Sequence, residues 1–234
     1  MALKAAIFDV FGTVVDWRRG VAEAVVPMLT AKGISMDPLA FADAWRAEYQ
    51  PGMEQVRSGA RGYVPLDALH LENLDRVLTA HGLANHFDAA ERAALNTAWE
   101  KLPPWPDCVG GIAAIGVTMP VAPCSNGSVG LIVRLARFAG LTWDAILGAD
   151  VARAYKPDPE AYRRSVAALG LAPAEVVMVA AHNGDLAAAR AEGLKTAFIP
   201  RPSEHGPGQT TDLAPSDDWD FVGHDMVDLA AKLA

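Results

Sequence analysis

The stretch Ala5-Ala6-Ile7-Phe8-Asp9-Val10-Phe11-Gly12-Thr13-Val14-Val15-Asp16 decides the predicted fold. An apolar run ends at Asp9, and a Gly12-Thr13 turn follows it at once. This pattern predicts a buried strand that carries a carboxylate at its carboxyl end, where open α/β sheets place their ligand sites. Position 11 is Phe, so no second acid stands two residues after Asp9.

Composition places the chain among globular proteins and limits its partners. It has 234 residues, of which 51% are hydrophobic and 21% charged, enough for one core with or without an insert. The net charge is −8 and no basic run occurs, which argues against nucleic acid and against a membrane as partners. Cys108 and Cys124 lack the spacing of a metal site, and a reducing compartment suits them. With no stretch typical of a signal peptide or a membrane span, the sequence predicts a cytoplasmic protein.

Strand-like apolar runs alternate with helical patterns over most of the chain. The predicted strands cover residues 4–9, 117–123, 145–149, 176–181, 196–199 and 220–222. The predicted helices between them cover residues 128–139, 159–169, 185–192 and 226–233. Gly140, Gly170 and Gly193 follow helical patterns in the way that C-terminal caps do. The sequence therefore predicts an α/β fold with a doubly wound parallel sheet.

Residues 16–102 show no strand pattern. Leu66, Leu69, Leu74 and Leu78 fall on one helical face, and residues 38–49 and 89–99 are predicted as further helices. The rigid segment 103–106 (Pro-Pro-Trp-Pro) returns the chain to the sheet. We therefore expect a core domain of residues 1–15 and 103–234, and a helical insert of residues 16–102 that closes over the ligand site. Residues 201–218, rich in Pro, Gly, Ser and Thr, are predicted as a loop.

Polar side chains follow four of the predicted strands. Asp9 ends the first strand, and Ser125-Asn126-Gly127 follows the second. Lys156-Pro157-Asp158 comes after the third strand, and His182-Asn183-Gly184-Asp185 after the fourth. Because the carboxyl ends of parallel strands share one edge of a sheet, we expect these groups to converge.

Each of these features also has a structural interpretation. Asp9 or Asp185 could only cap a helix, and Ser125-Asn126-Gly127 could be a simple turn. Lys156 could be a solvated surface lysine, and His182 a structural histidine. The functional interpretation rests on the order of all four groups and on their shared position at strand ends.

The ordered motifs Phe8-Asp9-Val10-Phe11-Gly12-Thr13, Ser125-Asn126-Gly127, Lys156-Pro157-Asp158 and Asn183-Gly184-Asp185 resemble those of the haloacid dehalogenase-like superfamily. Nearly the whole chain takes part in this resemblance, which implies a Rossmann-like core with the insert as a cap domain. The (S)-2-haloacid dehalogenase branch, with relatives that act on fluoroacetate, is the most similar.

The resemblance implies a role for each catalytic position. Asp9 is similar to the nucleophile that forms an ester with the α-carbon of the substrate, which water then hydrolyses. Thr13 corresponds to a residue that hydrogen-bonds the nucleophile. Lys156 is similar to the lysine that keeps the nucleophile ionised, since a nearby cation lowers the pKa of a carboxylate. Asp185 corresponds to the acid that orients Lys156 or the hydrolytic water.

The resemblance also implies a substrate-binding set and the partners of the protein. Arg46, on the predicted cap, is expected to bind the carboxylate or the halide, or else to form a helix-surface salt bridge. Tyr162 is expected in the site or packed on the sheet. The full expected substrate-binding set is Val10, Phe11, Arg46, Ser125, Asn126, Tyr162 and Asn183. The expected partners are a small halogenated acid and water, with no cofactor or metal, and a homodimer is suggested.

The last motif departs from the pattern of the family. The family has approximately Ser-Ser-Asn-x-x-Asp, whereas this chain has Ala180-Ala181-His182-Asn183-Gly184-Asp185. A serine hydroxyl is lost, and His182 replaces an asparagine. A neutral imidazole can accept a proton near neutral pH, so His182 is a candidate to activate the water that hydrolyses the Asp9 ester.

The absence of acidic residues at two positions distinguishes between phosphate hydrolysis and halide displacement. Phosphatases of the superfamily use a second Asp two residues after the nucleophile and hold Mg²⁺ with several carboxylates. Here Phe11 takes the first position, and Leu186, Ala187, Ala188 and Ala189 follow Asp185. Displacement of a halide at carbon needs neither group, because the halide leaves as an anion without a proton. The sequence therefore predicts a metal-independent 2-haloacid dehalogenase. The alternatives are a small-molecule phosphatase or phosphomutase, and a non-catalytic protein that binds a small acid or a protein.

Overall fold

The computed structural model of the chain describes residues 2–234. Six parallel strands form one sheet in the order β3-β2-β1-β4-β5-β6, which confirms the predicted α/β fold. The strands are β1 Ala5–Phe8, β2 Val121–Ser125, β3 Leu147–Gly148, β4 Val176–Ala180, β5 Lys195–Phe198 and β6 Phe221–Val222. The predicted strand over residues 117–123 was shifted, because Val117 caps a helix and is 85% exposed.

The first strand lies in the middle of the sheet. From β1 the chain moves outward through β2 and β3, then returns to the other side of β1 at β4 and continues to β5 and β6. The carboxyl end of β1 is therefore the point at which the connections diverge, the usual ligand position in such a sheet. Asp9 lies at this point, and its backbone N–H donates to the carbonyl of Val179 in β4 at 3.0 Å.

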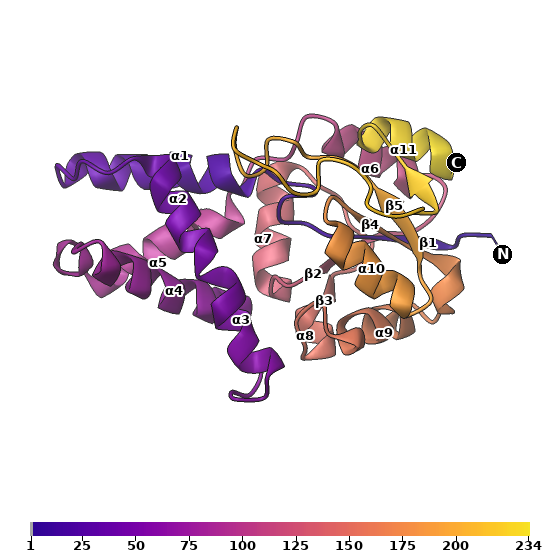
Figure 1. Ribbon diagram of the computed structural model, residues 1–234, viewed down its shortest axis with the longest axis horizontal. Coiled ribbons are helices and arrows are strands. Elements are labelled where there is room, and N and C mark those ends of the chain that lie inside the picture. The colour runs from indigo at the N-terminus through magenta and orange to yellow at the C-terminus, as the bar shows by residue number, and fades with distance from the viewer. Residues whose placement is uncertain (1) are drawn as a thin grey trace.

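Helices cover both faces of the sheet (Figure 1). Alternate residues of β1 point to opposite faces: Ala6 and Phe8 pack in one apolar cluster, and Ala5 and Ile7 in the other. The first cluster includes residues of α6 (Cys108–Gly116), α7 (Val129–Ala139) and α11 (Met226–Leu233). The second includes residues of α9 (Pro159–Ala168) and α10 (Asn183–Ala191). The short helix α8 (Ala149–Ala152) follows β3.

The helix boundaries follow the polar residues at their ends. Ser128 accepts a hydrogen bond from the Leu131 N–H at the start of α7, and Gly140 ends it with φ near 70°. A left-handed residue at this position favours glycine, so the cap predicted there is confirmed. The predicted helix over 226–233 matches α11. Helix α6 was not predicted.

Residues 16–102 form helices and no strand (Figure 1). These helices are α1 Trp17–Ala31, α2 Pro38–Ala47, α3 Tyr49–Arg57, α4 Leu66–Ala80 and α5 Ala89–Asn96. Asp16 caps α1, Asp37 caps α2, and Asp88 forms a capping box with Glu91 at α5. Sequence analysis assigned one helix to residues 38–49, whereas α2 and α3 meet there at Glu48.

The two connections between the helical insert and the sheet lie side by side. The Asp16 N–H donates to the Pro103 carbonyl at 2.9 Å, and the Trp105 N–H donates to the Val14 carbonyl at 2.9 Å. The insert also contacts the core beside β3, where the Tyr63 hydroxyl donates to Asp150 at 2.6 Å. The adjacent connections lie at the predicted boundaries 15/16 and 102/103, and the division into two domains there stays a prediction.

Two further features bear on the sequence predictions. Cys108 and Cys124 are both buried and free. Among residues 2–234, no helix has the length and apolar character needed to cross a membrane.

Candidate active site

Asp9 is the centre of a buried network of charges. It follows β1 directly and is 7% exposed. Its Oδ1 accepts a hydrogen bond from Lys156 Nζ at 2.9 Å, and its Oδ2 accepts one from Thr13 Oγ1 at 2.6 Å. Burial by itself raises the pKa of Asp9, but the charges of Lys156 and His182 outweigh it and hold the pKa well below its usual range. Asp9 is therefore ionised at neutral pH.

Lys156 links Asp9 to Asp185. Its ammonium group is buried and contacts Asp185 Oδ2 as well as Asp9. The other oxygen of Asp185, Oδ1, accepts a hydrogen bond from the Tyr162 hydroxyl. Burial opposes a charge on Lys156, yet the two carboxylates raise its pKa, so the ammonium stays protonated. Four of the predicted site residues, Asp9, Lys156, Asp185 and Tyr162, thus converge at the carboxyl edge of the sheet.

His182 contacts the oxygen of Asp9 that Lys156 does not. Its Nδ1 lies 3.0 Å from Asp9 Oδ2, and its Nε2 lies 2.8 Å from Glu204 Oε2. Burial by itself lowers the pKa of His182, but Glu204 and Asp9 outweigh it and hold the pKa well above its usual value. At neutral pH the imidazole is therefore protonated and donates to both carboxylates. We expected a neutral imidazole from the sequence, and the second carboxylate changes that protonation state.

Glu204 was missed by sequence analysis. It lies in the predicted loop 201–218 and is only 1% exposed. Its Oε1 accepts a hydrogen bond from Trp17 Nε1 at 3.0 Å. The one available signal was its position: this segment follows β5, whose carboxyl end lies on the same edge of the sheet as Asp9.

The Asn126 side chain, just after β2, holds the backbone of Lys156. Asn126 Oδ1 accepts a hydrogen bond from the Lys156 N–H at 2.7 Å, and Asn126 also lines the cavity beside Asp9. Ser125 is fully buried, and its Oγ accepts a hydrogen bond from the Gly127 N–H at 3.1 Å. Ser125 is not among the residues that line the cavity. Its role in binding the carboxylate of the substrate stays a prediction.

Asn183 does not point to the cavity formed by the other groups. Its side-chain amide donates to Asp212 Oδ1 at 2.8 Å and to the Ala214 carbonyl at 3.0 Å. Its oxygen accepts from the Ser216 N–H and from Trp219 Nε1. These contacts fasten the loop 201–218 and the adjoining Trp219, so the structure gives Asn183 an anchoring position outside the substrate site.

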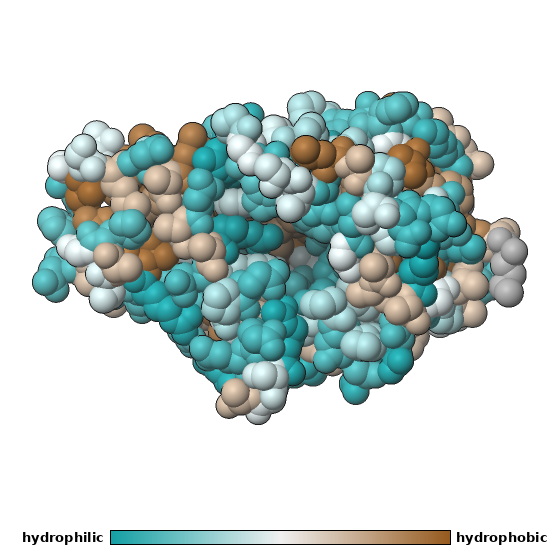
Figure 2. Space-filling model, in the orientation of Figure 1, coloured by the Kyte–Doolittle hydropathy of each residue, from teal (hydrophilic) through white to brown (hydrophobic). Residues whose placement is uncertain are grey.

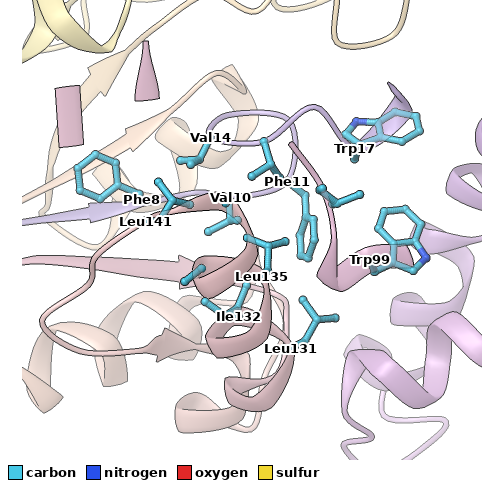
Figure 3. Close-up of a cluster of buried hydrophobic side chains, with 14 of the residues drawn as sticks. Phe8, Val10, Phe11, Val14, Trp17, Trp99, Leu131, Ile132, Leu135 and Leu141 are labelled. Carbon is cyan, nitrogen blue, oxygen red and sulfur yellow. The ribbon is translucent and has the colours of Figure 1, made fainter. Parts of the chain in front are cut away.

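Phe11 closes one wall of the site with an apolar side chain. Its ring is 3% exposed and meets Trp99 edge-on, with centroids 6.0 Å apart and an interplanar angle of 84°. Figure 3 shows Phe11 among Val10, Val14 and the leucines of α7, facing Trp99 of the helical insert. Val10 is fully buried in this cluster and does not line the cavity. Position 11 therefore contributes apolar surface where a second acid would otherwise stand.

A cavity of about 720 Å³ opens between the helical insert and the edge of the sheet. A hollow is visible between these two parts in Figure 2. Asp9, Lys156 and His182 line it from the sheet, and Arg46, Tyr49 and Arg57 line it from the insert. The volume is suited to a small molecule and its water.

Arg46 is a half-buried cation that lines this cavity. Its guanidinium carbon lies 4.0 Å from the ring centroid of Tyr49 and 5.2 Å from that of Trp17. Its Nη1 is buried and has no hydrogen-bond partner among residues 2–234. Leaving a buried charged donor unsatisfied is costly, so this position is suited to an anionic ligand. The alternative of a helix-surface salt bridge does not fit, because no carboxylate of the described chain pairs with Arg46.

The site thus combines an ionised nucleophile, an apolar wall and a half-buried cation, Arg46, that has no ion-pair partner among the described residues. Among residues 2–234, no group of three His, Cys, Asp or Glu side chains has the geometry of a metal site. The carboxylates near Asp9 are instead paired with Lys156, His182 and Tyr162. This arrangement is suited to nucleophilic attack by a carboxylate on a small anionic substrate.

Comparisons with known proteins agree with this geometry. The haloacid dehalogenase-like hydrolase family matches residues 3–193. The crystal structure of a defluorinating L-2-haloacid dehalogenase is 52% identical, with a TM-score of 0.97 over 99% of this chain and 95% of that one. A second L-2-haloacid dehalogenase structure is 43% identical, with a TM-score of 0.95 over 99% of both chains. An (S)-2-haloacid dehalogenase of Xanthobacter autotrophicus is 29% identical over 86% of this chain and 77% of its own length.

Proposed function

The chain belongs to the haloacid dehalogenase-like hydrolases, and we propose that it hydrolyses small 2-haloacids to 2-hydroxyacids through an ester on Asp9. The observation that carries this proposal is the pairing of an ionised Asp9 with an unpartnered Arg46 in one cavity. A carboxylate nucleophile needs to be ionised, and an acid substrate needs a cationic partner.

In the first step the Asp9 carboxylate attacks the α-carbon of the substrate. The bond from oxygen to carbon forms as the carbon–halogen bond breaks, and the halide leaves with the electron pair. One direct displacement inverts the configuration at that carbon. Lys156 and Thr13 hold the carboxylate in place, while Arg46 binds the carboxylate of the substrate or the departing halide.

In the second step water hydrolyses the ester. Its oxygen attacks the carboxyl carbon of Asp9, and the bond between that carbon and the oxygen of the hydroxyacid breaks. The acid and base of this step must lie within hydrogen-bond reach of the ester. His182 meets this requirement, with Nδ1 at 3.0 Å from Asp9 Oδ2. Asp185 contacts Lys156, which separates its carboxylate from Asp9.

We include fluoroacetate among the proposed substrates. Fluoride is a poor leaving group, so its departure needs well-aimed donors in a small space. The apolar ring of Phe11 and the guanidinium of Arg46 line the same cavity as Asp9, which supports a confined anion site there. The 52% identical structure is that of a defluorinating enzyme, which supports this extension.

The test is a halide-release assay in EDTA with chloro-, bromo- and fluoroacetate and both enantiomers of 2-chloropropionate. We expect the wild-type protein to form halide and hydroxyacid in equal amounts, at a rate that EDTA does not reduce. We expect Asp9→Asn to release no halide. Loss of turnover in EDTA would favour the phosphatase alternative. Asp16→Asn is a matched control: the Asp16 side chain lies in the same loop and caps α1, and Asn caps a helix about as well as Asp, so the variant should keep both the activity and the stability.

We also propose that the enzyme is a homodimer. Val129, Val133 and Phe138 leave apolar surface exposed along α7, which supports an interface between copies. Analytical ultracentrifugation checks this, and a monomer at all concentrations contradicts it. A cytoplasmic location stays a prediction from the sequence.

A further inference from the structure

Glu204 is a buried carboxylate built into the site from outside the known motifs. It is 1% exposed, its Oε2 lies 2.8 Å from His182 Nε2, and its Oε1 accepts the Trp17 Nε1–H at 3.0 Å. The neighbouring residue of the same loop, His205, has its Nε2 3.6 Å from Oε1. Burying a carboxylate is costly unless it is paired and hydrogen-bonded. The two oxygens of Glu204 are each paired, one of them with a group of the active site.

The nucleophile loop is shaped to admit this carboxylate. Gly12 has φ near 92°, and a Cβ there would lie 2.0 Å from Glu204 Oε1. Any other residue at position 12 would therefore displace Glu204. Glu204 therefore packs directly against the turn that follows Asp9, and the absence of a side chain at Gly12 makes room for its carboxylate.

Asp185 is poorly placed to act on the hydrolytic water. One of its oxygens contacts Lys156 and the other accepts the Tyr162 hydroxyl. His182, in contrast, reaches Asp9 directly with one nitrogen and Glu204 with the other. A nucleophile, an imidazole and a carboxylate in this linear order are the arrangement in which the third group orients the second.

We propose that Glu204 is a positioning residue for ester hydrolysis, which holds His182 in the orientation and tautomer that let Nδ1 exchange protons with the hydrolytic water. This inference rests on the proposed dehalogenase function. Nε2–H stays donated to Glu204 throughout, so only Nδ1 faces the Asp9 ester.

The proton balance of the cycle closes with this assignment. After halide loss, His182 releases its Nδ1 proton to solvent, the one proton that the overall reaction produces. Nδ1 then takes a proton from water as the water oxygen bonds to the Asp9 carboxyl carbon. When that carbon expels the hydroxyacid oxygen, Nδ1 returns the proton to it. The carboxylic acid left on Asp9 finally protonates Nδ1, which restores the resting state.

Ester formation itself changes the basicity of His182. In the resting enzyme Asp9 and Glu204 both raise the pKa of His182. The ester removes the charge of Asp9, so the pKa of His182 falls and the imidazole becomes a base only once the substrate is attached. The other charged groups near the network are Lys156 on Asp9, and Arg46 and His205 on Glu204. Glu204 remains as the counterion of the imidazolium that forms in the transition state.

Single-turnover kinetics of Glu204→Gln with (S)-2-chloropropionate tests this role. Halide release should keep its wild-type rate, while lactate formation slows about 100-fold, the lower end of what a general base contributes. Intact-mass measurement should find one substrate-derived ester for each Glu204→Gln chain. A purely structural role would slow both steps together, and that result, or no slowing of either step, overturns the proposal.

Two further variants keep the test decisive. Asp220→Asn loosens the far end of the same loop, since Asp220 accepts the Thr196 N–H at 3.0 Å, and it should accumulate no ester. If Glu204→Gln does not fold, Glu204→Asp should slow lactate formation about tenfold with halide release unchanged; equal slowing of both steps counts against the proposal. A wild-type enzyme that releases no halide contradicts the proposed function itself, whereas equal rates of both steps in Glu204→Gln contradict only the role of Glu204.

Discussion

Lys156 Nζ lies 2.9 Å from Asp9 Oδ1, and both groups are buried. This ion pair holds the pKa of Asp9 low against the effect of burial. A depressed carboxyl pKa stabilises the fold above the pKa of the unfolded chain, and this contribution is lost as the pH falls through the folded-state value. The Lys156–Asp9 ion pair therefore keeps the nucleophile ionised, and it stabilises the fold only while Asp9 is ionised.

Lys156→Met should raise the pKa of Asp9 and slow the first chemical step. With burial no longer opposed by the ammonium, part of Asp9 becomes protonated and unreactive. We expect halide release at pH 7 to fall about 100-fold and to rise with pH in the variant. Pre-steady-state halide release between pH 5 and 9 measures this. Lys195→Met is the control, because Lys195 pairs with Asp220 away from the site; an unchanged pH profile in Lys156→Met contradicts the prediction.

His182→Ala should separate the two steps of the reaction. Asp9 keeps Lys156 and Thr13 as partners, so the ester still forms, but its hydrolysis loses the imidazole. We expect a burst of one halide for each active site and an ester on Asp9 that mass spectrometry detects. Turnover should fall by about 100-fold or more. If halide and hydroxyacid appear together and no ester accumulates, hydrolysis does not depend on His182.

Arg46→Met should weaken substrate binding and have little effect on the reactivity of Asp9. Arg46 Nη1 has no partner in the described chain, and a hydrogen bond to a charged group contributes about 1.5–3 kcal/mol. We expect kcat/KM to fall about 10- to 100-fold in steady-state kinetics of halide release.

Arg92→Met is the matched control for Arg46. Arg92 also lies on the helical insert, where it pairs with Asp75 at 2.7 Å. Its loss should cost stability and leave kcat/KM unchanged. Equal effects of the two variants on kcat/KM would mean that Arg46 acts through the packing of the insert and not by binding an anion.

Much of the site was predictable because strand ends are visible in the sequence. An apolar run followed by Asp9, or by His182, marks the carboxyl end of a buried strand, and parallel strands bring such ends together. The pattern predicts that Asp9, Lys156 and Asp185 meet at one edge of the sheet. The structure confirms that they meet.

The residues that were missed depend on tertiary contacts with no local pattern. Glu204 stands in a segment rich in Pro and Gly, where nothing nearby indicates burial. Its environment comes from Trp17 and Gly12, which are almost 190 residues earlier in the chain. Asn183 belongs to a recognisable motif, yet its partners lie in the same loop as Glu204. Helix α6 is not predicted from the sequence because glycine has a low helix propensity, and its Gly110-Gly111 pair weakens the helical pattern.

Phe11→Asp tests whether a missing acid alone separates this enzyme from phosphatases. Phe11 packs edge-on against Trp99 and is 3% exposed, so a carboxylate there would be buried without a partner. We expect a loss of about 3–5 kcal/mol in the free energy of unfolding, measured by urea denaturation. No phosphatase activity on p-nitrophenyl phosphate with Mg²⁺ should appear, because Leu186 and Ala189 follow Asp185 where further acids would be needed. Phe11→Leu keeps the apolar wall and should cost less than about 1.5 kcal/mol. Hydrolysis of the phosphate ester by Phe11→Asp would show that the rest of the site is already suited to phosphorus.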